Sequence, residues 1–169
     1  TMPALTLARI QKKLGRDREQ SKLLDKLAFS RHNKPFKKDG ITPFDWLSRD
    51  GEEVRKYVED PYCGFVFTAG GFYDLFSGLK ALAHLPRLKA LPASLPIYLI
   101  AGDKDPVGAF GAGVKTVAQQ YRDAGVQDVQ IKLYDGARHE LFNETNREQV
   151  MDDLAAWLES QLSSTERSP

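Results

Sequence analysis

The sequence has a single cysteine, Cys63, and almost no excess of charge of either sign. One cysteine excludes an internal disulfide framework and a cysteine-rich zinc site, and it is typical of a reducing compartment. We therefore expect a cytoplasmic protein. The 24 Lys and Arg residues are nearly balanced by 23 Asp and Glu residues, so a basic surface for nucleic acid is not expected.

Long apolar segments are absent as well. The longest apolar run lies around residues 95–101, whereas about 20 apolar residues are needed to cross a bilayer. No basic segment followed by an apolar one opens the chain, so no signal peptide is visible. What is present is 41% hydrophobic and 28% charged residues over a length of 169, which is typical of a folded domain with a core.

The first part of the chain, residues 1–92, has the spacing of helices joined by loops. Apolar residues recur at helical intervals near the start of the chain, and Asp50 followed by Glu53 predicts the beginning of another helix. An apolar, aromatic stretch over residues 65–82 predicts one or two more. Three prolines within residues 85–96 then predict a linker.

The pattern changes over residues 93–162. Residues 97–101 form a continuous apolar run that ends at Gly102, which is typical of a strand buried on both faces. Residues 129–133 predict a second strand, and the apolar positions between the two strands fit a helix that ends at Gly125. The order of strand, helix and strand predicts an α/β fold with a parallel sheet.

A last helix and a tail follow the second strand. Thr145 and Glu148 form a capping box ahead of an amphipathic stretch, and residues 163–169 predict a tail. Parallel sheets usually have five or more strands, and only two are found in this sequence. We therefore expect residues from elsewhere to complete the sheet.

Polar residues follow both predicted strands. Asp103 and Asp105 come after the first strand, and His139 comes after the second. Because the carboxyl ends of parallel strands lie at the same edge of a sheet, an acid and the histidine are expected to meet there. In such a pair the histidine acts as a general base and the carboxylate fixes its tautomer. Spacing alone leaves both aspartates open as the acid.

Two segments carry a family resemblance: LPIYLIAGDKDPVG (residues 95–108) and IKLYDGARHELFNETNREQVMDDLAAWL (131–158). They resemble the α/β-hydrolase superfamily, and more narrowly its lysophospholipase, monoacylglycerol lipase and serine aminopeptidase group. In that family a G-x-x-D motif carries the acid of the catalytic triad, and a later G-x-x-H-E motif carries the histidine. These motifs correspond to Asp105 and His139. The resemblance implies a helical lid before an α/β-hydrolase core.

The same resemblance implies a serine hydrolase that cleaves carboxylic esters such as monoacylglycerols or lysophospholipids, without a metal or an organic cofactor. The family nucleophile lies in a G-x-S-x-G motif. None of the nine serines of this sequence lies in that motif, and Ser77, in Phe76-Ser77-Gly78, lacks its first glycine. We therefore expect a fragment that is inactive alone. Its nucleophile half, or a homodimer mate, would complete the sheet.

Four phenylalanines of the helical part have two interpretations. They fit the core of that part, and they also fit the apolar wall of a substrate pocket. The four candidates are Phe65, Phe67, Phe72 and Phe76.

Other functions stay open beside the hydrolase. A strand with an unpaired edge binds other chains, so the sheet would also suit a noncatalytic partner-binding module. Residues 108–116 nearly match the phosphate-binding G-x-x-x-x-G-K-T loop, but Val114 moves Lys115 by one position, about 100° around a helix. Cys63 lacks the strand-turn-helix frame of a nucleophile.

Overall fold

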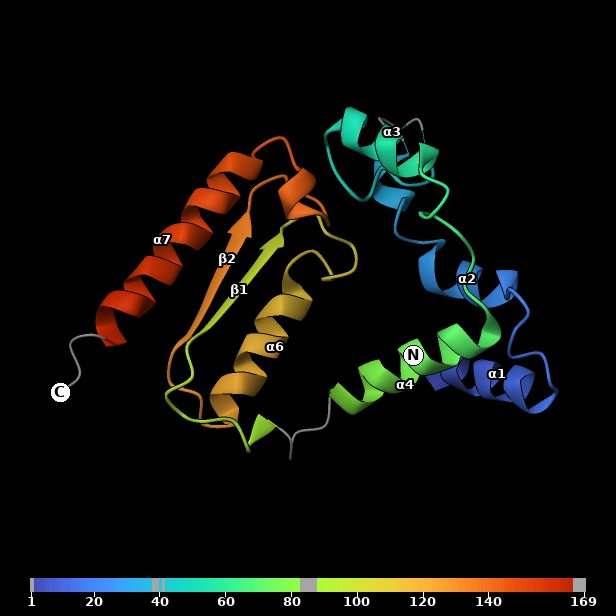
Figure 1. The fold of residues 1–169 in the computed structure, drawn as a ribbon, viewed down its shortest axis with the longest axis horizontal. Helices are drawn as coiled ribbons and strands as arrows, with labels where there is room; N and C mark the ends of the chain where they lie inside the picture. Colours follow the sequence, from blue (N-terminus) through green and yellow to red (C-terminus); the bar gives the residue numbers. More distant parts are fainter. Residues whose placement is uncertain (1, 38–39, 41, 83–87, 166–169) are drawn as a thin grey trace.

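The computed structural model describes residues 2–37, 40, 42–82 and 88–165. A helical part contains α1 to α4, and a second part contains two strands with a helix on each side (Figure 1). All four helices of the helical part precede the two strands in the sequence. Among the described residues, no helix is both long and apolar enough to cross a membrane.

The helical part is held together by small residues packed around one aromatic ring. Its elements are α1 (Met2–Lys13), α2 (Lys22–Phe29), the 3₁₀ helix η1 (Lys34–Phe36), α3 (Gly51–Glu59) and α4 (Ala69–Leu82). Alanines let α1 and α4 approach each other closely, and Phe72 fills the space between the helices. The buried cluster consists of Ala4, Ala8, Leu24, Ala69 and Phe72.

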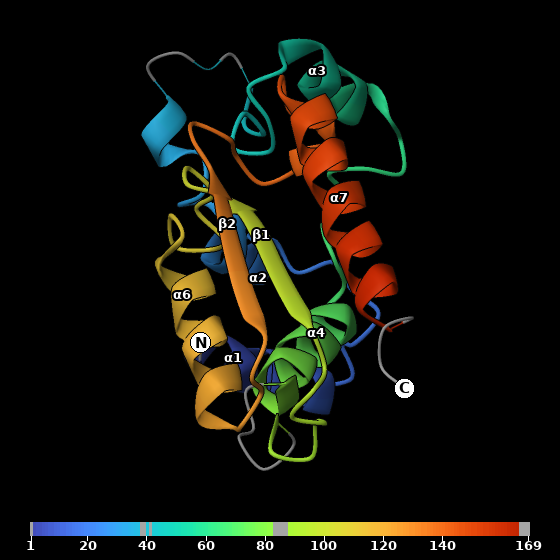
Figure 2. The ribbon, with the colours of Figure 1, turned by 90° about the vertical axis from the view of Figure 1, so that its left-hand side faces the viewer.

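The second part has the predicted α/β order. Its elements are β1 (Ile97–Gly102), α6 (Ala112–Asp123), β2 (Val129–Tyr134), the 3₁₀ helix η2 (Leu141–Asn143) and α7 (Arg147–Thr165). The two strands are parallel, with Ile97 beside Val129 and Gly102 beside Tyr134. Figure 2 shows α6 and α7 on opposite sides of this strand pair. The prediction of a parallel sheet is confirmed.

The observed ends of the helices can be compared with the capping residues that the sequence predicts. Asp50 caps α3 as predicted, because its carboxylate accepts hydrogen bonds from the backbone N–H groups of Glu52 and Glu53. Gly125 follows α6 with a φ of 104°, a conformation that favours glycine. The helix α7 begins at Arg147, one residue later than a cap at Thr145 predicts. The predicted linker lies partly outside the described residues, and residues 89–95 form turns.

Candidate active site

The turn after β1 and the loop after β2 bring an aspartate and a histidine together. The Nδ1 atom of His139 lies 3.2 Å from Oδ2 of Asp105. The other oxygen of the carboxylate accepts a hydrogen bond of 2.8 Å from the backbone N–H of Val107, and Asp105 is buried. The carboxylate is therefore fixed from its own turn while it faces the imidazole.

The second aspartate after β1 has a different position. Oδ1 of Asp103 accepts a hydrogen bond of 2.7 Å from the backbone N–H of Gly136, and Oδ2 lies 3.0 Å from the Lys104 amine. Asp103 thus ties the two strand-end loops together. Of the two acids that spacing leaves open, Asp105 is the one in contact with the histidine.

A glycine allows these two loops to approach each other. A Cβ atom at Gly102 would overlap the carbonyl oxygens of Ala137 and Arg138. The backbone N–H of Lys104 also donates to the Ala137 carbonyl at 3.0 Å. The close approach that Gly102 permits therefore sets the distance between the loops that carry Asp105 and His139.

The acid–histidine contact changes the protonation of both partners. Burial raises the pKa of Asp105, but the hydrogen bonds with His139 and Val107 outweigh it and hold the pKa below its usual value. The hydrogen bond to Asp105 raises the pKa of His139 above its ordinary value of 6.5, and burial opposes this rise only in part. The imidazolium is therefore stabilised, as a general base requires when it takes up a proton.

Two aromatic residues of the helical part also lie at the histidine. The ring centroid of Trp46 is 5.1 Å from that of His139 and 5.0 Å from that of His32. Burial lowers the pKa of His32, and its Nδ1 is buried without a partner among the described residues. Trp46 and His32 were not predicted from the sequence as neighbours of His139, because no local pattern links them to a histidine about 100 residues later.

A mostly apolar cavity of about 600 Å³ opens beside His139. Phe76, one of the four candidate phenylalanines, lines it together with residues of α1, α2 and α4. Val107 lines it from the turn that carries Asp105. The remaining wall consists of Ala4, Leu5, Leu27, Ala28, Phe29, His32, Trp46, Leu75, Leu79 and Lys80.

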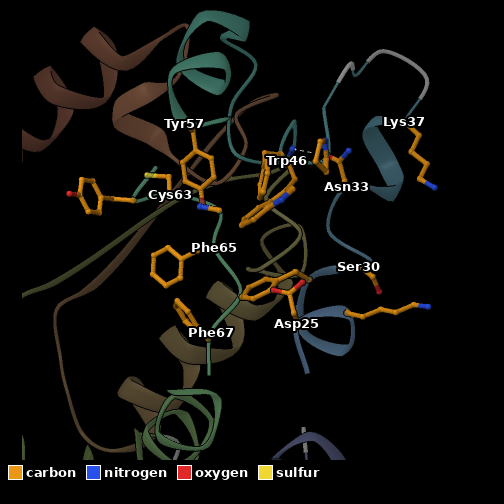
Figure 3. Close-up of a pocket in the computed structure, with 15 residues that line it drawn as sticks. Asp25, Ser30, Asn33, Lys37, Trp46, Tyr57, Cys63, Phe65 and Phe67 are labelled. Atoms are coloured by element: carbon orange, nitrogen blue, oxygen red, sulfur yellow. Dashed lines mark hydrogen bonds between the residues drawn. The ribbon is translucent and has the colours of Figure 1, made fainter. Parts of the chain in front are cut away.

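A second cavity, of about 620 Å³, lies in the helical part (Figure 3). It shares Phe29 and Trp46 with the first cavity, so these two side chains stand between the two spaces. Phe65 and Phe67 line the second cavity. Phe72 lines neither cavity, because it is fully buried in the helical core and its ring packs against Phe67 and Phe76.

The glycine-rich segment before α6 has a local structural role. Ala109, Phe110 and Gly111 all have positive φ angles, of 50°, 56° and 84°. This left-handed turn brings the backbone N–H of Phe110 to 2.8 Å from the carbonyl oxygen of Asp105. The segment thus closes the turn that carries the acid. Phosphate binding here stays an untested hypothesis.

The remaining candidates for chemistry are weaker. Burial raises the pKa of the Cys63 thiol, which disfavours a thiolate nucleophile. Within the described ranges, no group of three His, Cys, Asp or Glu side chains is arranged to hold a metal ion.

The chain matches a known protein family and a known lipase. The family described as "Serine aminopeptidase, S33" matches residues 5–146. A monoacylglycerol lipase of Mycolicibacterium smegmatis is 33% identical over 121 residues, which are 70% of this chain and 40% of the lipase.

Solved structures extend the comparison to the fold. A thermostable carboxyl esterase from Bacillus coagulans, in complex with glycerol, is 25% identical with a TM-score of 0.82 and covers 96% of this chain. A lipase in an open form is 28% identical with a TM-score of 0.75 and covers 95%. This chain covers 52% and 51% of those two proteins, so it spans about half the length of its solved relatives.

Proposed function

Because the chain belongs to the serine aminopeptidase S33 family and has part of an α/β-hydrolase fold, we propose that it supplies the acid and the base of a serine ester hydrolase. The observation that carries this proposal is the 3.2 Å contact between Asp105 and His139 at the wall of an apolar cavity. Asp105 is buried and ionised, and His139 has a raised pKa.

The proposed mechanism assigns one step to each side chain. Asp105 occupies Nδ1 of His139, which leaves Nε2 to take the proton of a serine hydroxyl as the serine attacks the ester carbonyl. The imidazolium then donates this proton to the leaving alcohol. Asp105 keeps the ring in the required tautomer throughout.

The nucleophile is proposed to come from outside these 169 residues. The sequence contains no G-x-S-x-G motif, which holds the serine at the top of the sheet in α/β-hydrolases. Strands that carry this serine would pair with the β1–β2 sheet, and their loops would supply the oxyanion hole. Alone, the chain is expected to be inactive.

The proposed substrate is a lipid-like ester, such as a monoacylglycerol or a lysophospholipid. The cavity at His139 is lined mainly by aliphatic and aromatic side chains, which suit an acyl chain. The similar lipase acts on monoacylglycerol by name, and the similar esterase holds glycerol. These relatives favour an ester over the amide bond that an aminopeptidase cleaves.

Turnover of p-nitrophenyl esters by the enzyme that contains this chain tests the proposal. We expect His139→Gln and Asp105→Asn each to lower kcat by about 10³- to 10⁴-fold. Asp103→Asn is the matched control, since it makes the same change two residues away. Its amide oxygen can still accept the hydrogen bond from the Gly136 N–H, so kcat should stay within about tenfold. Near wild-type turnover in Asp105→Asn would show that the acid is assigned wrongly.

A noncatalytic module that binds a partner through the sheet edge remains the alternative proposal. A buried carboxylate that fixes a histidine beside a cavity is not needed for such a module, which is why the hydrolase is preferred. The same assay separates the two proposals, because the module would show no turnover that depends on His139.

A further inference from the structure

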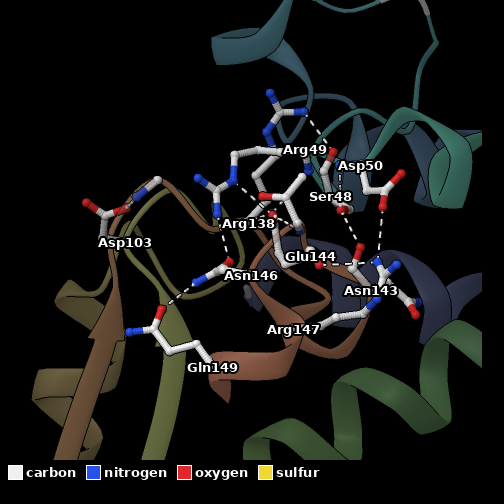
Figure 4. Close-up of polar contacts among 12 residues, drawn as sticks. Ser48, Arg49, Asp50, Asp103, Arg138, Asn143, Glu144, Asn146, Arg147 and Gln149 are labelled. Carbon is white, nitrogen blue, oxygen red and sulfur yellow. Dashed lines mark hydrogen bonds and ion pairs between the residues drawn. The ribbon is translucent and has the colours of Figure 1, made fainter. Parts of the chain in front are cut away.

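Glu144 is a fully buried carboxylate in the loop between His139 and α7. A charge out of contact with water is costly unless hydrogen bonds and an opposite charge compensate it. Here the compensation comes from two segments that lie far apart in the sequence, as Figure 4 shows around Glu144.

Four N–H groups donate to this carboxylate. Oε1 accepts from the backbone N–H of Arg49 at 3.1 Å and of Arg138 at 2.8 Å. Oε2 accepts from Nε of Arg49 at 2.9 Å and from the backbone N–H of Thr145 at 3.1 Å. Both oxygens are therefore used, and they join the helical part to the residue that immediately precedes His139.

Further contacts continue this junction along residues 45–50. The Arg138 guanidinium donates to the carbonyl oxygens of Asp45 and Ser48. The backbone N–H of His139 donates to the Trp46 carbonyl at 3.4 Å. The Ser48 hydroxyl donates to the carbonyl of Asn143 at 2.7 Å (Figure 4). The loop that carries His139 is thus held by the helical part as well as by the turn after β1.

We propose that Glu144 is a positioning residue of the active site, which locks the histidine loop onto residues 45–50 so that His139 stays against Asp105 and Trp46. This inference rests on the proposed function, in which His139 is the general base. Glu144 itself lies outside the cavity lining and acts through the backbone of Arg138 and Arg49.

The pKa of His139 distinguishes a positioning role of Glu144 from a purely structural one, because a purely structural role would leave this pKa unchanged in the folded protein. The raised pKa of His139 depends first on its hydrogen bond to Asp105. If the loop loosens, this bond is made for less of the time and the pKa falls. Among the described residues, the other charged or titratable side chains that act on the imidazole or line its cavity are Glu140 in its own loop and His32 and Lys80 from the helical part.

NMR titration of the histidine Cε1–H signals in the enzyme that contains this chain measures that pKa directly, without a substrate. The chain has three histidines, and His139→Gln assigns the relevant signal. The test variants are Glu144→Gln and Arg49→Met, with Glu148→Gln as the matched control on the exposed first turn of α7.

The two variants remove opposite charges, which separates positioning from simple electrostatics. Through charge alone, Glu144→Gln would lower the pKa of His139 and Arg49→Met would raise it. If the loop is positioned by this contact, both variants lower the pKa toward 6.5, and Glu148→Gln leaves it unchanged.

Shifts of opposite sign, or no shift in either variant, would overturn the proposal. Circular dichroism identifies the temperatures at which each variant is folded. If Glu144→Gln does not fold, Arg49→Met alone is the test, because the Arg49→Met variant keeps three of the four hydrogen bonds to Glu144. Failure of the hydrolase proposal would appear in the ester assay and not in this titration.

Discussion

The protonation of His139 is controlled by a few side chains, of which Asp105 contributes most. The sequence predicted this pair, because each residue follows a strand and parallel strands end at one edge. Spacing could not distinguish Asp105 from Asp103, since both follow β1 directly. The family resemblance favoured Asp105, and the turn geometry separates the two independently, because the Asp103 carboxylate is bound to the backbone of Gly136.

Replacing Asp105 by Asn is predicted to lower the pKa of His139. The carboxylate is the main cause of the raised pKa, and an amide cannot stabilise the imidazolium by charge. A general base must be neutral, so if His139 has this role the rate is expected to fall as the pH drops through its pKa, and the acid limb of kcat/KM is expected above pH 6.5 in the wild type. NMR titration checks the shift, and an unchanged pKa in Asp105→Asn would contradict it.

Two glycine substitutions are predicted to have opposite effects on stability. Gly102→Ala places a methyl group against the carbonyl oxygens of Ala137 and Arg138, which should lower the free energy of unfolding by about 2–3 kcal/mol. Gly78→Ala, inside α4 with nothing within 4 Å of the added carbon, should raise it by about 0.5–1 kcal/mol. Urea unfolding measures both, and a stable Gly102→Ala protein would mean that the loops can separate at little cost.

Helix ends were predictable where a short local signal marks them. Asp50 caps the start of α3 and Gly125 follows the end of α6, as the sequence predicts. The helix α7 starts one residue later than a cap at Thr145 predicts, and its first i→i+4 hydrogen bond runs from the backbone N–H of Val150 to the Asn146 carbonyl. Thr145 instead donates its backbone N–H to the buried Glu144 carboxylate, a contact that depends on the tertiary structure and cannot be inferred from the capping pattern alone.

The N-terminus of α2 provides a test of capping in the helical part. The Ser21 hydroxyl accepts a hydrogen bond from the backbone N–H of Leu24 at 3.4 Å, and Ser21 is buried. Ser21→Ala should lower the free energy of unfolding by about 1 kcal/mol. Ser94→Ala, in an exposed turn, is the control and should have no measurable effect. Equal unfolding curves for both variants would show that the Ser21 cap does not contribute.

The junction between the two parts of the molecule was not predictable from the sequence. The change from helical to α/β pattern was visible, but residues 45–50 contact the histidine loop about 90 residues later. Periodicity reports which face of an element is apolar, and it carries no information on which distant loop that element meets. The cavity at His139 could therefore not be predicted, because it forms between α1, α2, α4 and the turn that carries Asp105.

Trp46 and Phe29 separate the two cavities, so truncating Trp46 is predicted to change the preferred acyl length. Trp46→Ala would join two spaces of about 600 and 620 Å³. In the enzyme that contains this chain, the ratio of kcat/KM for a twelve-carbon over a four-carbon p-nitrophenyl ester should rise about tenfold. Tyr62→Ala, at an 84% exposed position on the rim of the second cavity, should leave the ratio unchanged. An unchanged ratio in Trp46→Ala would show that the two cavities do not communicate.

Labelling with a fluorophosphonate, located by mass spectrometry of the peptides of the purified enzyme, tests most directly whether Asp105 and His139 complete a serine nucleophile. We expect one adduct on the serine-bearing part outside these 169 residues, and loss of most of the labelling rate in His139→Gln. An adduct on this 19.0 kDa chain, with Ser77 as the first serine to test, would contradict the proposal. Labelling that is equally fast without His139, or no labelling at all, would contradict it as well.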